Sequence, residues 1–300
     1  MYVLSEQSAT RPDQQAHVAL GIGLMLLGVF FFSVNDVMGK WLVATYSVGQ
    51  LLLIRSAAAL LLLAPFVWSA GWKAFVPMPQ PGLQLLRVIL GSCEVGLFYW
   101  AVVYLPLADV VTYYLAGPIY VTALSAILLR EKVGWRRWTA VTVGFVGVLI
   151  ALRPSAATMS WPAMIALAGS LVYALLLVTT RTLRGTSDIV LISTQVATTF
   201  VLGLLTASFG WVTPSPRDLV LLAILGMVAM AALICINRSL KLAPASVVVP
   251  YQYTMIVWAV ILGYIAFGDA PRTHTLIGAA IITGAGLFIF FRERRLAASE

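Results

Sequence analysis

Long apolar runs alternate along the chain with short polar segments. A run of about 20 apolar residues is long enough, as a helix, to cross a hydrocarbon core roughly 30 Å thick. Turn-forming segments such as "VPMPQPG" at 76–82 and "TPSPRD" at 213–218 separate the runs. The pattern predicts ten transmembrane helices, at residues 18–40, 48–69, 84–105, 108–129, 136–153, 161–183, 187–209, 217–242, 245–267 and 274–292.

The composition agrees with this pattern. The chain is 61% hydrophobic and only 10% charged, whereas soluble domains carry roughly 25% charged residues. The expected fold class is therefore an all-α polytopic membrane protein whose surface is covered largely by the lipid bilayer. The net charge of +8 does not indicate a nucleic-acid partner, because the basic residues lie between apolar segments, as membrane topology requires.

The basic residues also predict the orientation. With the N-terminus in the cytoplasm, 14 of the 19 Lys and Arg residues fall on the inner side and 4 on the outer side, which leaves Arg55 alone within a span. Residues 1–17 and 293–300 are then cytoplasmic tails. The first 17 residues lack an apolar stretch of signal-peptide length, so we expect the first span to remain as a helix in a bacterial inner membrane.

Two similar segments divide the chain into halves. "LPLADVV" (105–111) and "LAPASVV" (242–248) each join two spans through a tight proline-containing turn. The halves, residues 18–153 and 161–292, contain five predicted spans each. Because five is odd, the second half enters the membrane in the opposite orientation, and such inverted repeats are common in secondary transporters.

These features resemble those of a known family. Ten spans in two sets of five, tight proline turns before spans four and nine, and "LLREKVGWRRW" (128–138) are similar to the drug/metabolite transporter superfamily and its EamA-like members. Among these, the chain most resembles bacterial exporters of aromatic and neutral amino acids of the YddG type. The resemblance implies that spans one to four and six to nine surround a central cavity. It also implies peripheral fifth and tenth spans, and transport by rocking of the two halves.

Glu94 is a carboxylate in the middle of a predicted span, where an ionised group costs about 2.5 kcal/mol or more. One interpretation is an ion pair with Arg55, which lies at a compatible depth, with Asp36 competing for the same arginine. The other is that Glu94 faces the cavity. Buried ionisable groups either pair or line water, so both interpretations stay open.

Several aromatic and polar residues also lie within the spans. Tyr and Trp are usually interface anchors, but four tyrosines lie deep enough to bind an aromatic substrate: Tyr99, Tyr113, Tyr114 and Tyr253. Asn35, Asn237 and Gln252 could ligate its polar groups, the alternative being hydrogen bonds between helices, which we favour for Gln195. Pro118 and Pro250 are expected to bend spans four and nine.

The sequence argues against an enzyme. It has two histidines, no HExxH or GxSxG motif and no phosphate-binding glycine loop. No catalytic residue, metal or cofactor is therefore expected. The predicted function is secondary export of small metabolites, most closely aromatic or neutral amino acids, by alternating access. The alternatives are a carrier of nucleotide sugars or phosphate esters, which should show several basic residues at cavity depth, and a membrane scaffold that does not transport. The oligomeric state is not fixed by the sequence, and a monomer is consistent with it.

Overall fold

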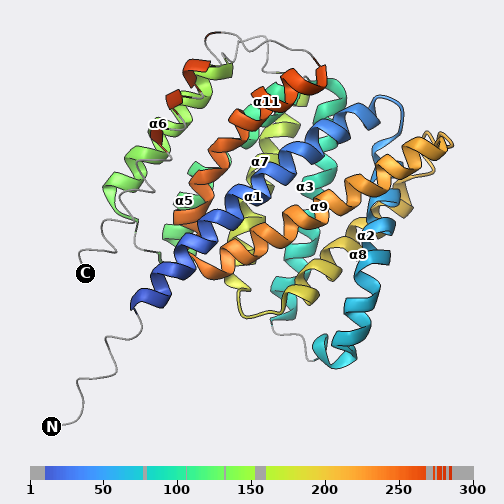
Figure 1. Ribbon diagram of the computed structural model, residues 1–300, viewed down its shortest axis with the longest axis horizontal. Coiled ribbons are helices and arrows are strands. Elements are labelled where there is room, and N and C mark those ends of the chain that lie inside the picture. The colour runs from blue at the N-terminus through green and yellow to red at the C-terminus, as the bar shows by residue number, and fades with distance from the viewer. Residues whose placement is uncertain are drawn as a thin grey trace.

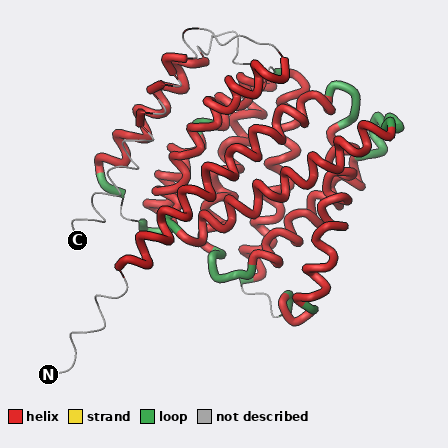
Figure 2. Tube along the Cα trace, viewed as in Figure 1, coloured by secondary structure: helices red, strands yellow, loops and turns green. Residues whose placement is uncertain are grey.

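The computed structural model describes residues 11–76, 80–105, 107–131, 133–152 and 160–267, with short helical pieces at 273, 276–278, 280–281 and 284–285. Within these residues every regular element is a helix (Figure 2). The tails at 1–10 and 293–300 and most of the predicted tenth span lie outside the described residues.

The first half consists of six α-helices and one 3₁₀ turn. They are α1 (Arg11–Val43), α2 (Val48–Ala70), η1 (Trp72–Ala74), α3 (Pro81–Tyr104), α4 (Leu107–Tyr114), α5 (Gly117–Leu128) and α6 (Trp135–Leu152). Local chemistry starts α2, because the Ser47 hydroxyl accepts a hydrogen bond from the Gln50 backbone N–H. The first helix begins seven residues earlier than predicted, at Arg11 rather than residue 18.

The described part of the second half is also helical. It contains α7 (Trp161–Thr182), α8 (Asp188–Thr206), α9 (Pro216–Leu242), α10 (Ala245–Val248), η3 (Val249–Thr254) and α11 (Met255–Phe267). Ser187 and Ser215 cap α8 and α9 in the same way that Ser47 caps α2. Pro216 occupies the first turn of α9. Backbone N–H groups in a first turn have no partner within the helix, so the N–H that proline lacks costs no hydrogen bond there.

The fourth and ninth predicted spans are interrupted helices. The fourth is divided into α4 and α5 at Leu115–Ala116, directly before Pro118, and the ninth tightens into the 3₁₀ segment η3 around Pro250. Seven helices of the described residues are long and apolar enough to cross a membrane, and two shorter apolar helices fall within the fourth and fifth predicted spans. The perturbations expected at Pro118 and Pro250 are observed as a break in the fourth span and as a 3₁₀ segment in the ninth, and Ala245–Ala266 as a whole is still long and apolar enough to cross a membrane.

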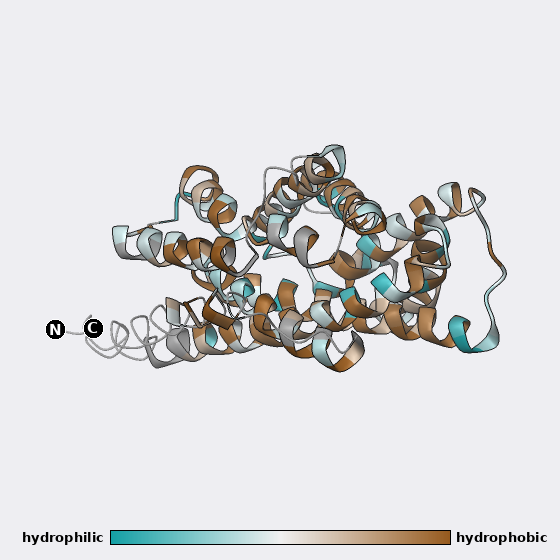
Figure 3. Ribbon diagram, turned by 90° about the horizontal axis from the view of Figure 1, so that it is seen from above, coloured by the Kyte–Doolittle hydropathy of each residue, from teal (hydrophilic) through white to brown (hydrophobic). Residues whose placement is uncertain are grey.

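Three long helix pairs form the body of the bundle. α1 runs along α9, α2 along α8 and α3 along α7 (Figure 1), while α6 packs against α4, α5 and η3 at one edge. Brown, hydrophobic residues predominate along the helices in Figure 3, and large apolar side chains such as Leu61 and Trp68 are exposed to 76% and 89%. Such an apolar exterior is suited to lipid.

Candidate functional site: a central cavity

Two adjoining cavities lie inside the bundle. Together with the solvent-open space at their mouths, one occupies about 760 Å³ and the other about 630 Å³. Five residues line both and so mark where the cavities meet: Phe32, Arg55, Glu94, Val95 and Tyr173. We call the first the Arg87 cavity and the second the Tyr99 cavity, after a residue that lines only that one.

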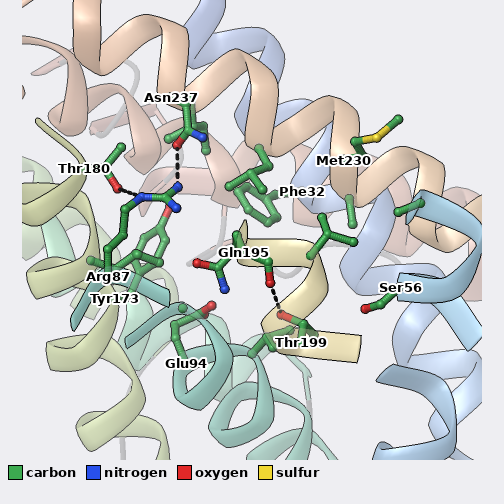
Figure 4. A pocket seen from close by; sticks show the side chains of 18 of the residues that line it. Phe32, Ser56, Arg87, Glu94, Tyr173, Thr180, Gln195, Thr199, Met230 and Asn237 are labelled. Carbon is green, nitrogen blue, oxygen red and sulfur yellow. Dashed lines mark hydrogen bonds between the residues drawn. The ribbon is translucent and has the colours of Figure 1, made fainter. Parts of the chain in front are cut away.

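One face of α3 supplies the chemistry of the Arg87 cavity. Arg87, Gly91 and Glu94 follow at intervals of four and three residues, so they lie on the same side of the helix. At Gly91 an added Cβ would lie closer than 3.0 Å to the amide group of Gln195, from α8. The glycine therefore makes room for the Gln195 amide, toward which the Glu94 carboxyl group points (Figure 4).

Arg87 is fully buried, and each of its nitrogens has a hydrogen-bond acceptor. Its Nε donates to Thr180 Oγ1 at 3.0 Å and Nη2 to Asn237 Oδ1 at 3.3 Å (Figure 4). Its Nη1 donates to the Leu191 carbonyl at 2.9 Å. The three acceptors belong to α7, α8 and α9. One guanidinium thus joins α3 to three helices of the second half.

A tyrosine organises the polar side of the Tyr99 cavity. Tyr99 is 0% exposed, and its hydroxyl accepts hydrogen bonds from Asn35 Nδ2 at 3.1 Å and from Arg55 Nη1 at 3.2 Å. Asn35 Nδ2 also lies 3.4 Å from Asp36 Oδ1. Asn35 Oδ1 and Asp36 Oδ2 are buried without hydrogen-bond partners, so this end of the cavity offers free acceptor atoms.

The interrupted helices complete the wall. Tyr114 is the last residue of α4, and its hydroxyl lies 3.4 Å from the backbone carbonyl of Glu94. From η3, Gln252 Nε2 donates to the Tyr173 hydroxyl at 2.7 Å. Irregular backbone inside a membrane is tolerated where it is buried in protein or lines a cavity, and both interruptions satisfy this condition.

The structure brings most of the sequence candidates together. Asn35, Tyr99, Tyr114 and Gln252 line the Tyr99 cavity, Asn237 lines the Arg87 cavity, and Glu94 lines both. Asp36 and Arg55, expected as structural or gating residues, also belong to the lining.

Two candidate tyrosines lie elsewhere. Tyr253 donates from its hydroxyl to the Val141 carbonyl of α6 at 3.1 Å, and its ring packs where Gly144 leaves space. Tyr113 packs against the hydrophobic core, and neither residue is in the lining of the two cavities. Pro118 and Pro250 are buried at the interruptions rather than in the lining.

Of the two interpretations of Glu94, the structure favours the one in which it faces the cavity: Glu94 lines both cavities, and no ion pair joins it to Arg55 among the described residues, where Arg55 is bonded to Tyr99. Two expectations need correction. Gln195 was expected to hydrogen-bond between helices, but its Oε1 is buried without a partner beside the cavity. Arg55 is not the only basic residue at depth, because Arg87 lines the same site.

Arg87 could have been found from the sequence. It stands near the start of a predicted span, so it falls among the 14 basic residues assigned to the inner side of the membrane. Its spacing from Glu94 nevertheless places both residues on one face of the helix. Tyr173 and Thr180 gave no comparable signal, because Tyr and Thr are ordinary components of transmembrane helices.

The residues described by the structure contain no group of three or more metal-ligating side chains. What they contain instead is a polar, aromatic-walled cavity inside an apolar helical bundle with interrupted helices at its wall. A central polar cavity walled by interrupted helices is typical of polytopic membrane transporters.

Comparison with known proteins agrees with this class. The EamA-like transporter family matches the chain twice, at residues 19–153 and 160–291, and the chain belongs to this family. It is accordingly a multi-pass protein of the bacterial inner membrane. A solved crystal structure shares the fold, with a TM-score of 0.74 and 18% identity over 94% of this chain and 98% of that one.

Curated relatives transport several different metabolites. The chain is 28% identical to the S-adenosylmethionine uptake transporter of Rickettsia felis, covering 92% of this chain and 94% of that protein. It is 29% identical to the riboflavin transporter of Vibrio cholerae (79% and 80% covered) and 26% identical to the pseudopaline exporter of Pseudomonas aeruginosa (88% and 94% covered). These relatives support small-molecule transport, and they do not support aromatic amino acids in particular.

Proposed function

We propose that this chain is a secondary carrier of ten spans in two inverted repeats, which opens its central cavity alternately to each side of the membrane. The two matches to one family, at 19–153 and 160–291, support the repeat. In such a repeat α1, α2 and α3 correspond to α7, α8 and α9. Exchanging the halves then turns the contact between α1 and α9 into the contact between α7 and α3, and it turns the contact between α2 and α8 into itself. The observed packing is consistent with such a two-fold relation.

The orientation in this proposal follows the distribution of Lys and Arg. Both termini lie in the cytoplasm, as do the end of α9 and the start of α8. The sequence has no phosphate-binding glycine loop, so transport in this proposal is driven by gradients.

The substrate proposed is a small metabolite with an aromatic part and charged groups. The observation that carries this is the lining of the cavity, in which Tyr99, Tyr114 and Tyr173 stand beside two carboxylates and two guanidiniums. Tyrosine rings offer flat apolar surfaces with a polar edge, and arginine binds carboxylates through its planar fork. S-adenosylmethionine has an adenine ring, a sulfonium cation and an amino-acid end, and it is the first compound to test.

The test is uptake of labelled S-adenosylmethionine into proteoliposomes that contain the purified protein. We expect saturable uptake above that of protein-free vesicles. Unlabelled riboflavin, tryptophan and a nucleotide sugar, added separately as competitors, rank the alternatives. Strong competition by tryptophan alone would restore the amino-acid assignment, and competition by the nucleotide sugar alone would favour phosphate esters. Absence of saturable uptake, with no competitor carried when labelled itself, would refute the proposed function.

A further inference from the structure

Arg87 carries a charge that the described residues do not neutralise. Its side chain is 0% exposed, and its hydrogen-bond acceptors are a hydroxyl, a backbone carbonyl and a side-chain amide oxygen. Arg181, Arg238 and Lys241 form ion pairs, whereas no carboxylate among the described residues pairs with Arg87. A buried charge without a countercharge costs several kcal/mol, so an anion arriving beside Arg87 would be bound favourably.

Two N–H groups of Arg87 remain available for such an anion. A guanidinium has five N–H donors, and the three bonds use one on each nitrogen. A planar pair of N–H groups matches the two oxygens of a carboxylate.

Asn237 supplies a further donor at the same place. Arginine only donates hydrogen bonds, so the amide oxygen of Asn237 must face Arg87 and its Nδ2 must face away. Asn237 is 2% exposed, its Nδ2 has no hydrogen-bond partner, and the residue lines the Arg87 cavity. A buried donor left without a partner is costly, and a substrate oxygen would satisfy it.

The opposite polarity is found two turns along α3. Glu94 lies seven residues from Arg87 on the same face, about 10.5 Å along the helix axis. The Oε1 of Gln195, a buried acceptor without a partner, lies against Gly91, between Arg87 and Glu94. This face of α3 therefore has the donors of Arg87 at one end and the carboxyl group of Glu94 at the other, with the Gln195 amide between them (Figure 4).

We propose that Arg87 and Asn237 form a carboxylate subsite, and that the cationic group of the same substrate lies toward Glu94 and Gln195. The inference rests on the proposed function and narrows it to dipolar metabolites, which carry both a carboxylate and a cationic group. The competing explanation is that Arg87 only ties α3 to α7, α8 and α9.

The substitution Asn237→Asp separates these explanations. An aspartate at this position still accepts a hydrogen bond from Arg87, so the contact between α3 and α9 persists. Its carboxylate would, however, neutralise the guanidinium charge to which the substrate carboxylate would bind. As a matched control, Ser92→Ala removes a different buried contact between α3 and α8, the one to Thr199 Oγ1 at 3.4 Å, and leaves Arg87 intact.

Thermal stabilisation in detergent by paired compounds provides the readout. Each pair has one member with a carboxylate and one without it: S-adenosylmethionine with its decarboxylated form, and tryptophan with tryptamine. In the wild type and in Ser92→Ala we expect the acid to bind at least 10-fold more tightly than its partner in at least one pair. In Asn237→Asp that preference should disappear, and in Arg87→Lys it should shrink.

The inference fails if the wild type binds the decarboxylated partners as tightly as the acids, or if Asn237→Asp keeps the preference. Absence of stabilisation by any compound also refutes the subsite, whereas the proposed function is decided separately by the flux measurement. If Asn237→Asp does not fold, Arg87→Lys alone decides: an unchanged preference in that variant refutes the subsite.

Discussion

The two ends of the bundle are held by different kinds of contact. α9 runs from one end to the other, since 27 residues rise about 40 Å. At the end where α9 finishes, the contacts are between charged groups, and we call it the Glu131 end. At the end where α9 begins, the contacts are mainly between closely packed backbones, and we call it the Tyr46 end.

Glu131 is the centre of the first set. Its carboxylate accepts hydrogen bonds from the Ala245 and Ser246 backbone N–H groups and from the Ser246 hydroxyl. The Glu131 carboxylate thereby caps the start of α10. It also pairs with Arg181, which donates to the last carbonyls of α9. Asp188 nearby pairs with Arg238 and Lys241.

Glycines dominate the second set. An added Cβ at Gly49 would meet the backbone of Thr206 and one at Gly203 the backbone of Leu53, each closer than 3.0 Å. The same packing continues to the depth of the cavity, where an added Cβ at Gly226 would meet the carbonyl of Arg55, also closer than 3.0 Å. α2, α8 and α9 therefore touch backbone to backbone. Polar contacts at this end include the bond from Tyr46 to Asp218 and the pair of bonds between the Gln50 amide and the backbone N–H and carbonyl of Val212.

The difference indicates that the two ends open in different ways. Ion pairs and hydrogen bonds can be exchanged for bonds to water when a surface separates, whereas closely packed backbones lose their dispersion contacts when they separate. We expect the Glu131 end to open by separation of its charged contacts, and the Tyr46 end to open around the α2–α8–α9 packing, which stays intact.

The largest effect is expected from Gly226→Ala. The new methyl group would collide with the Arg55 carbonyl, so α2 and α9 would have to move apart. Overpacking of this kind should lower the free energy of unfolding by about 3 kcal/mol, measured by denaturant titration in detergent. Gly23→Ala is the control, because nothing lies within 4 Å of its added Cβ, and equal stability of the two variants would refute the close-packing account.

Glu131→Ala should have the next largest effect. The change removes the charged cap of α10 and leaves Arg181 without its carboxylate partner. We expect it to lower the free energy of unfolding by about 2 kcal/mol. The same titration measures it, with the exposed Arg184→Ala as the control. We also expect faster chemical labelling of a cysteine placed at Ala245 in the Glu131→Ala background; unchanged labelling would show that this carboxylate does not hold the end closed.

A smaller effect is expected from Asp188→Asn. Its partner Arg238 is 60% exposed, while Lys241 is 16% exposed, so water screens part of the attraction. The free energy of unfolding should fall by about 1 kcal/mol at low ionic strength, and this decrease should become smaller in concentrated salt. A loss that does not depend on salt would mean that Asp188 acts through something other than these ion pairs.

Tyr46→Phe should have the smallest effect, and one that depends on pH. The hydrogen bond donated to Asp218 raises the pKa of the Tyr46 phenol above its ordinary value of 10.0. The neutral phenol is the donor, so this stabilisation is complete below pH 10.0 and is lost as the pH rises through the raised pKa. The unfolding midpoints of wild type and Tyr46→Phe should therefore differ at neutral pH and converge in alkali. The exposed Tyr264→Phe is the control, and a constant difference would contradict the assignment.

The regular helices could be predicted closely from the sequence. The predicted span at 48–69 is observed as Val48–Ala70, and that at 217–242 as Pro216–Leu242. Apolar length and serine or proline at the helix start are local signals, and they determine these boundaries. The interruptions at Leu115–Ala116 and in η3 were not predicted, because a proline reports that a helix is perturbed and not whether it bends, breaks or tightens.

The site was only partly predictable for a related reason. Glu94 was conspicuous because a carboxylate is rare within an apolar run. Arg87 was not, because arginine near a predicted span end is common, and its burial depends on Thr180, Leu191 and Asn237 from the other half. Tyr253 could not be assigned to one side of its helix because the 3₁₀ geometry of η3 changes the direction in which its side chain points.

The ionisable side chains of the two cavities have an electrical consequence. The lining contains two basic residues, Arg55 and Arg87, and two acidic residues, Asp36 and Glu94. Their formal charges sum to zero. Moving one elementary charge across a membrane potential of 100 mV changes the free energy by about 2.3 kcal/mol. An empty cavity with these formal charges would reorient without moving net charge, so the membrane voltage would not bias its return. Any voltage dependence of the flux would then report the net charge of the substrate itself.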